Sequence, residues 1–395
     1  MSFPEVPPIE IDEATRDQVL QRLATKIRKF YCEPDKAELI ATDLESRTTK
    51  NEFVKGSTLQ ELKNLLNPIL KASDLHFGIH ILPADEAIME EPQDTGEFEE
   101  PSSEDTARYT EQVALKNFGI PKAEILQGNV GYFKWDNQHN CKISSQRVID
   151  TLNYLSDSNA LIVDLRECGG GDPDTADVLY DVLFEGEIHV NDFYWRPTNE
   201  TKARIVGKRD RFPTLKRKWF DKPVYILVSN VTFSCGEEIA YTLQTFGRAK
   251  IIGSNTGGGA HPGMTVWLHP QAIAFISTGI NINTLTKTDW EPNGVIPDYS
   301  YDPEMALLVA HKLALEYVVD KFAEKTAQHF KTFVESSKTK IEALTNEIEK
   351  FSPKSEAPAS NATWIKTITT TKKITKKNGR EVVETTTRTS YDQKI

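Results

Sequence analysis

Hydrophobic positions in the first 73 residues recur at the three- and four-residue spacing of amphipathic helices. In EATRDQVLQRLATKIRKFY, residues 13–31, the apolar side chains that share one side are Val19, Leu20, Leu23, Ile27 and Phe30. Segments 36–48 and 56–73 continue this spacing, and Ser57 or Thr58 stands where a helix N-cap is expected. The pattern predicts a small helical subdomain over residues 1–73.

Between residues 111 and 300 short apolar runs alternate with amphipathic segments. The segments that read as strands are NVGYFKWD (129–136), NALIVDLREC (159–168), KPVYILVSN (222–230) and the start of AKIIGSNTGGGAHPG (249–263). Helices are expected over 144–158, after the glycines of 169–184, and over 235–247, whereas 264–284 reads as a hairpin. Strands that alternate with helices predict an α/β core, which we place at residues 127–305.

The segment that joins these two regions, residues 74–126, begins with alternating polarity in LHFGIHIL (75–82), which is typical of a strand. An acidic stretch follows: ten acidic residues and no Lys or Arg lie between Asp85 and Asp105. We expect this stretch to be a solvated loop or insertion on the surface.

The C-terminal part of the chain divides into residues 306–351, which read as helical, and residues 352–395, which form a linker and a Thr-rich tail. Asn378-Gly379 at the centre of the tail is a turn signal for a hairpin, although a disordered tail is an equally open interpretation. Residues 364–395 carry eight Lys and Arg against three acidic residues, so docking of this basic tail on a partner is one possibility.

Composition narrows the classes of protein to consider. A net charge of −11 argues against nonspecific nucleic-acid binding. The N-terminus MSFPEVPPIEIDEATRD lacks the pattern of a signal peptide, and no apolar run is long enough to span a bilayer, so a cytoplasmic protein is expected. The four cysteines are scattered without a CxxC pair, and His76 and His80 alone are too few for a metal site, so we expect no metal. The glycine turns lack the P-loop and Rossmann patterns, so we expect no nucleotide cofactor either.

Two glycine-containing turns follow buried strands and could carry chemistry. The turn after DLREC, which begins at Gly169 and Gly170, could point backbone amides at an oxyanion, or could be a simple tight turn. Ser234 stands between the apolar run 222–230 and a predicted helix, where a nucleophile or a helix cap would stand. The amide of Cys235 would lie at the N-terminus of that helix. The residues alone leave both alternatives open.

Five motifs in order resemble the S41 serine peptidase family, which includes C-terminal processing proteases, tricorn-core-like proteases and the modules of interphotoreceptor retinoid-binding protein. These motifs are VGYFKWD, NALIVDLRECGGGDP, VSNVTFSCGEEIAYTLQ, GSNTGGGAHP and WEPNGVIPDYSYDP. The resemblance covers roughly residues 13–320. GGGAHP and the lack of a recognisable PDZ insert favour the branch of the retinoid-binding and tricorn-like proteins. The resemblance to this family implies a ClpP/crotonase-like fold, a spiral of ββα units.

The resemblance also implies roles for particular residues. Ser234 matches the nucleophile, His76 in Asp74-Leu75-His76 the base, and Glu291 the acid that completes the set. The oxyanion donors map onto Gly169 or Gly170 together with Cys235. Two further positions are possible supporting residues: His261, an alternative base, and Gly258 in the glycine loop.

Two departures from the family pattern bear on activity. The loop that holds a Lys base in tail-specific members reads NTGGGA here, with Gly259 at the Lys position, and Leu75 replaces the Ser that precedes the His in tricorn-like members. The resemblance therefore implies a serine endopeptidase with a Ser-His-Glu arrangement. Its substrates would be unstructured peptides or the C-terminal ends of proteins, and a homo-oligomer is one possible state of assembly. The alternative is an inactive member that carries retinoids or fatty acids or has a structural role.

Overall fold

The computed structural model describes residues 6–92, 102–351, 364–377 and 380–393. The chain divides into two units, residues 1–349 and 350–395. In the second unit, β13 (Trp364–Lys377) pairs antiparallel with β14 (Arg380–Gln393), which confirms the predicted hairpin. The linker 352–363 and the Asn378-Gly379 turn lie outside the described residues.

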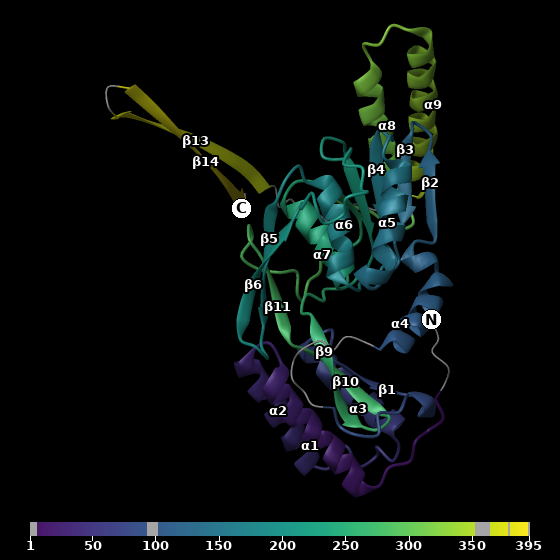
Figure 1. The fold of residues 1–395 in the computed structure, drawn as a ribbon, viewed down its shortest axis with the longest axis vertical. Coiled ribbons are helices and arrows are strands. Elements are labelled where there is room, and N and C mark those ends of the chain that lie inside the picture. Colours follow the sequence, from purple (N-terminus) through teal and green to yellow (C-terminus); the bar gives the residue numbers. More distant parts are fainter. Residues whose placement is uncertain (1–5, 93–101, 352–363, 378–379, 394–395) are drawn as a thin grey trace. The chain divides into compact units, whose positions relative to one another are not determined.

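A six-stranded sheet forms the core of the α/β region, and Figure 1 labels its strands β2, β3 and β4. The order of its strands is β12-β8-β7-β4-β3-β2. All neighbours are parallel except β2 and β3. The strands are β2 (Lys122–Leu126), β3 (Val130–Lys134), β4 (Ala160–Asp164), β7 (Val224–Val228), β8 (Lys250–Gly253) and β12 (Tyr299–Ser300). The mixed α/β fold expected from the sequence is confirmed.

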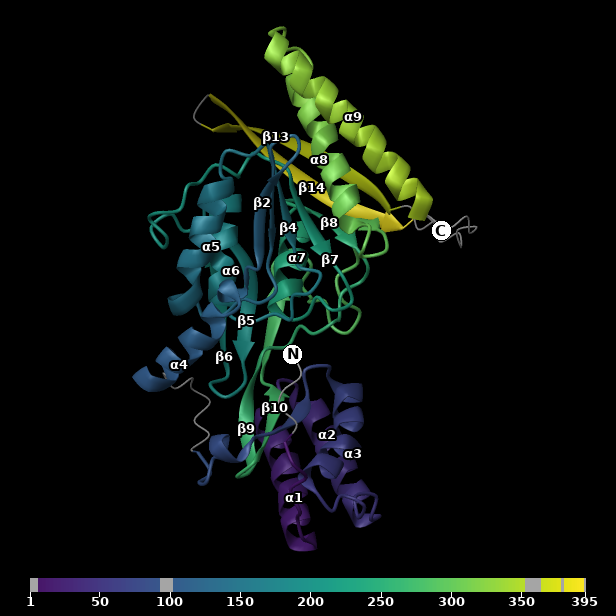
Figure 2. The ribbon, with the colours of Figure 1, turned by 90° about the vertical axis from the view of Figure 1, so that its right-hand side faces the viewer.

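Helices cover both faces of this sheet because its strands are apolar on both sides. Phe133, Val163 and Ile226 point to the face that holds α5 (Cys141–Leu155), α6 (Pro173–Leu183) and α7 (Cys235–Thr245). The next residues along the strands, such as Tyr132 and Ile162, pack on the opposite face with α8 (Ala306–Phe322) and with Ile348 of α9 (Gln328–Phe351). Figure 2 shows α5 and α6 on one side of the strands and α8 on the other.

The N-terminal helices are α1 (Glu13–Phe30), α2 (Pro34–Thr49) and α3 (Leu59–Ser73), as the hydrophobic spacing predicts. Thr58 is the N-cap of α3, since its side chain accepts a hydrogen bond from the Glu61 amide. These helices share a core with the small sheet β1-β10-β9, formed by β1 (Gly78–Ile81), β9 (Gly263–His269) and β10 (Ala272–Ser277). The helical subdomain is thus completed by strands from almost two hundred residues further along the chain.

The predicted hairpin over 264–284 is only partly correct. β9 and β10 do pair, but β11 (Gly279–Asn283) leaves them and joins a third sheet with β5 (Ile188–Trp195) and β6 (Glu200–Val206). Part of the acidic stretch, residues 93–101, lies outside the described residues. On its two sides stand the short helix η1 (Ala84–Glu86) and α4 (Ser103–Ala114), and η2 (Asn117–Gly119) precedes β2. None of the helices in the described part of the chain is long and apolar enough to cross a membrane.

Candidate active site

Ser234 lies on a sharp turn between the buried strand β7 and helix α7, of which it is the N-cap. Its backbone has φ 52° and ψ −123°, a conformation that non-glycine residues avoid. Hydrogen bonds from the preceding residues hold the turn: Thr232 Oγ1 donates to the Leu165 carbonyl at 2.7 Å and the Phe233 amide to the Cys168 carbonyl at 2.9 Å. Such strained strand–turn–helix connections present the nucleophilic serine in other hydrolases.

The glycine turn after β4 packs directly on this serine. A Cβ atom at Gly170 would lie 2.7 Å from the Ser234 Cβ and 3.1 Å from the Cys235 nitrogen, and Gly170 has φ 99°. At Gly171, with φ 137°, a Cβ would lie 2.1 Å from the Gln138 carbonyl oxygen. Only glycine fits at either position, and the close approach brings the two turns singled out in the sequence together.

The amides of these turns differ in their availability. The Gly169 amide donates to the Asp136 carbonyl at 3.2 Å, so it is already engaged. The Gly170 backbone faces the thiol of Cys168, whose pKa is raised to about 11 by burial. The Cys235 amide, at the first position of α7, has no acceptor within the described residues. Cys235 therefore offers the best-placed donor for an anion beside Ser234.

His76 is placed against the serine turn by stacking. Its ring packs on Phe233, with centroids 4.6 Å apart, and on Phe275 of β10, at 5.8 Å. Both ring nitrogens are buried, and neither has a hydrogen-bond partner among the described residues. Burial lowers the pKa of His76 to about 4, so the imidazole is neutral near pH 7 and can accept a proton. Gly259 lies against both rings, since a Cβ there would be 2.2 Å from Phe233 Cζ and 2.6 Å from His76 Cε1.

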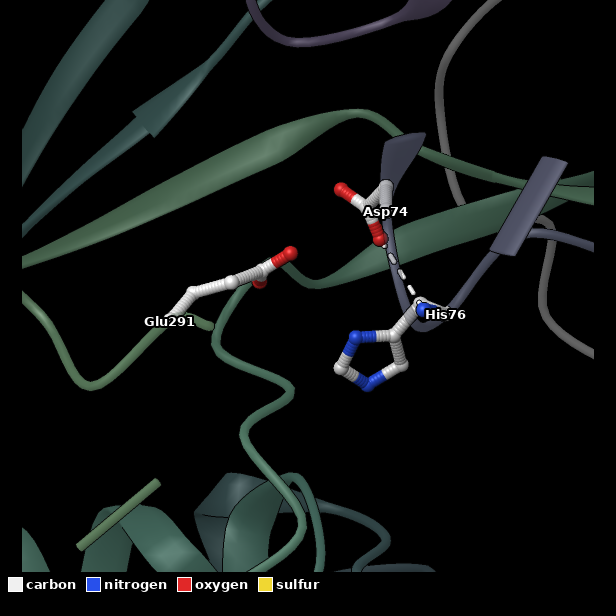
Figure 3. A group of neighbouring side chains, drawn as sticks. All are labelled: Asp74, His76 and Glu291. Carbon is white, nitrogen blue, oxygen red and sulfur yellow. Dashed lines mark hydrogen bonds between the residues drawn. The ribbon is translucent and has the colours of Figure 1, made fainter. Parts of the chain in front are cut away.

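Asp74 and Glu291 lie next to this imidazole (Figure 3). The His76 backbone amide donates to Asp74 Oδ1 at 2.9 Å, and Glu291 Oε2 accepts from the Ala260 amide at 2.9 Å. One ligand atom from each of Asp74, His76 and Glu291 lies within 4.8 Å of the other two. The structure thus brings the predicted acid near the predicted base, without a hydrogen bond between their side chains.

His261 fills the space between these two carboxylates. Its Nδ1 lies 3.0 Å from Asp74 Oδ2 and 3.2 Å from Glu291 Oε2, and its Nε2 lies 3.6 Å from Asp289 Oδ2. Burial favours the neutral ring, but hydrogen bonds to Asp289 and Asp74 raise the pKa of His261 to about 12. His261 is therefore an imidazolium. It is a less suitable base than His76, because it already holds its proton.

This imidazolium decides the charge of its neighbours. Burial works to raise the pKa of Asp74, but hydrogen bonds from His261 and Ser277 keep that pKa below its ordinary value. Burial and the charge of Asp74 raise the pKa of Glu291 to about 7. Three side chains here could reach one metal ion, yet the His261 imidazolium already lies against the two carboxylates and offsets one of their charges, which disfavours a second cation.

His261→Gln is expected to destabilise the fold by about 3 kcal/mol at pH 6, because it leaves Asp74 and Glu291 buried without their cation. The folded-state pKa of His261 lies above its unfolded value of about 6.5. The stabilisation is therefore complete below pH 6.5 and declines as the pH rises toward the folded pKa. The difference in free energy of unfolding from wild type, measured by urea denaturation, should be larger at pH 6 than at pH 9.

The control for this prediction is His189→Gln, which removes a half-exposed histidine that contacts Asp192 at 2.8 Å. A loss below about 1 kcal/mol is expected there, as for exposed ion pairs. A difference between His261→Gln and wild type that stayed constant from pH 6 to pH 9 would show that His261 is not protonated.

Another buried carboxylate, Glu237 on the first turn of α7, connects the serine turn to the glycine loop. It accepts hydrogen bonds from the Ser234 amide, the Thr256 hydroxyl, and the amides of Gly258 and Gly259. The predicted supporting residue Gly258 thus contacts Glu237, with its amide 2.6 Å from Oε1.

Sequence reasoning found most of these residues but missed how they are connected. Glu237 stands three residues after Ser234, and this spacing is the capping-box signal that could have revealed its contact with the Ser234 amide. Asp289 and Phe233 carried no signal of their own. His80, on the same predicted face as His76, is exposed on β1 and takes no part.

Comparisons with known proteins give one family match and several similar structures. Residues 129–301 match the model of "Peptidase family S41". Among solved structures, a lipoprotein from Streptococcus agalactiae is similar over 80% of this chain and 99% of its own, at 15% identity and TM-score 0.49. The photosystem II D1 C-terminal processing protease matches over 75% and 95%, at 13% identity and TM-score 0.45. The tricorn protease matches over 84% and 37%, at 12% identity and TM-score 0.45.

The family match covers the segment that holds both turns of the site and Glu291. The narrower placement beside the interphotoreceptor retinoid-binding proteins stays a prediction.

Proposed function

The α/β core of this chain, residues 129–301, belongs to peptidase family S41, and from this premise we propose that the protein is a serine-type peptidase with Ser234 as its nucleophile. The observation that carries the proposal is the strained backbone of Ser234, with φ 52° and ψ −123°, pressed against Gly170. A plain helix cap adopts an extended backbone conformation and needs no such strain. Ser234 is also partly exposed, as attack on a substrate requires.

In the proposed mechanism, the Ser234 hydroxyl attacks the carbonyl carbon of a peptide bond while His76 takes its proton. The negative charge that develops on the carbonyl oxygen is stabilised by the Cys235 amide, with the Gly170 amide as the second donor. His76 then protonates the leaving amine, and water releases the acyl group by the reverse sequence.

Glu291 is the proposed acid that stabilises the His76 imidazolium as it forms. Its carboxylate lies with Asp74 beside the His76 ring, and an imidazole that gains a proton in a buried site needs such a counter-charge. A hydrogen bond between the Ser234 hydroxyl and His76, which the free site lacks, would form when the substrate displaces water, as in other hydrolases whose free sites are loosely aligned.

We propose unstructured peptides or the C-terminal ends of proteins as substrates. Such a segment has an extended backbone that can pair with an exposed strand edge, and hydrolysis at Ser234 needs no cofactor in this scheme.

Digestion of an unstructured protein such as reduced casein, followed by mass spectrometry of the products, tests this function. Wild type is expected to release peptides, and Ser234→Ala to release none. Intact casein after prolonged incubation with well-folded wild type would contradict the proposal, and retinoid or fatty-acid binding would then be the next measurement.

A further inference from the structure

The Glu237 carboxylate is buried and fully occupied by hydrogen-bond donors. Its Oε1 accepts from Thr256 Oγ1 at 2.5 Å and from the Gly258 amide at 2.6 Å. Its Oε2 accepts from the Gly259 amide at 2.8 Å and from the Ser234 amide at 2.9 Å. A carboxylate has about four acceptor positions, so both oxygens are saturated.

These donors come from two segments that would otherwise be independent. The Ser234 amide belongs to the strained turn, whereas Thr256, Gly258 and Gly259 belong to the loop after β8. This loop in turn sets the place of the proposed base, because Gly259 packs against both Phe233 and His76 Cε1. One carboxylate therefore connects the backbone of the proposed nucleophile to the surface on which the proposed base rests.

The hydrogen bonds require oxygen at both positions of the side chain. Val295 donates its amide to Thr256 Oγ1 at 2.6 Å, which directs the Thr256 hydroxyl proton toward Glu237. An isosteric amide at position 237 would place its NH₂ group against the Gly258 amide in one orientation, or against the amides of Ser234 and Gly259 in the other. Two N–H donors would then face each other in a buried site, and their repulsion would push either the Ser234 turn or the 256–259 loop away from residue 237.

We propose that Glu237 is a positioning residue that holds the Ser234 turn and the 256–259 loop in register, so that nucleophile and base face each other. The inference rests on the proposed function and deepens it. Glu237 touches no substrate in this account; it acts through the backbone of Ser234 and through the glycine loop that supports His76.

The test compares Glu237→Gln with Glu238→Gln. Glu238 is the adjacent buried residue on the same helix turn, and its carboxylate contacts Arg204 and Asn191, whereas only its backbone amide, which the substitution keeps, bonds to the Ser234 carbonyl. The first measurement is amide hydrogen exchange of the full chain, read on peptides that cover 229–239 and 254–262. Glu237→Gln is expected to increase exchange about tenfold or more in both segments, and Glu238→Gln to leave the 254–262 peptide unchanged.

The second measurement is labelling by a fluorophosphonate, analysed as a maximal inactivation rate and a half-saturating concentration. For Glu237→Gln we expect the maximal rate to fall about a hundredfold with an unchanged half-saturating concentration, whereas Glu238→Gln keeps both. If Glu237 were only needed for folding, its substitution would lower the fraction of protein that can be labelled, but the folded fraction would react with the wild-type maximal rate.

The outcomes separate the two ideas. If wild type is never labelled, the proposed peptidase function is contradicted. If Glu237→Gln still shows the expected increase in exchange, the coupling by Glu237 is supported independently of that function. If wild type is labelled, and Glu237→Gln has the same exchange and the same labelling rates as wild type, the positioning role of Glu237 is overturned. The proposed peptidase function is unaffected by that result.

Discussion

Ser234→Ala is expected to reduce kcat for peptide hydrolysis on the order of 10⁴- to 10⁶-fold, because it removes the atom that forms the acyl bond. The residual rate would come from the Cys235 amide and from substrate binding alone. The variant loses the capping-box contact of the Ser234 side chain with the Glu237 amide, but it should still fold, because the amide of residue 234 still donates to the Glu237 carboxylate. Steady-state hydrolysis of a fluorogenic peptide measures the loss.

A second variant, Ser234→Gly, checks the strain on which the assignment depends. Glycine tolerates φ 52° without the cost of a Cβ, so this variant should be equally inactive but more stable than Ser234→Ala by about 1 kcal/mol. Full hydrolysis by either variant would exclude Ser234 as the nucleophile.

His76→Ala is expected to cost a similar 10⁴- to 10⁶-fold in kcat, because a serine without a base is a weak nucleophile near neutral pH. The matched control is His80→Ala, which removes an exposed histidine from the neighbouring strand and should leave kcat unchanged. Equal activity of both variants would show that His76 is only a packing residue between Phe233 and Phe275.

The pH profile gives this assignment a second signature. Burial lowers the pKa of His76 to about 4, so the base stays neutral and the rate should stay high until the pH falls toward that value. Burial raises the pKa of Glu291 to about 7, so a change in rate near that pH could come from this carboxyl group. The pH profile of Glu291→Gln, measured alongside, identifies such a contribution. A wild-type acid limb at pH 6.5 that persists in Glu291→Gln would mean that His76 is exposed to water or is not the base.

Local patterns predicted the parts of the structure that are stabilised locally. The helical spacing of Leu20, Leu23 and Ile27 predicted α1, and the apolar run before Ser234 predicted a buried strand that leads into a helix. The β5–β6 pair escaped prediction, since its strands are partly exposed and alternate only weakly.

For the site, the sequence predicted which residues take part but not how they contact one another or what charge they carry. Ser234, His76 and Glu291 emerged from a family resemblance, but their spacing along the chain carries no information on the charge of the place where they meet. That charge is set by His261, which contacts Asp74, Glu291 and Asp289 through tertiary packing. The contact of Glu237 with Gly258 and Gly259 likewise joins residues about twenty positions apart, beyond any helical or strand period.

The most direct test of the central claim is to treat purified wild type with a fluorophosphonate and to locate the adduct by mass spectrometry of its peptides. The account predicts one phosphonylated residue, Ser234, with labelling lost in Ser234→Ala and in His76→Ala. Failure of a folded wild type to react, or an adduct on another serine, would contradict it.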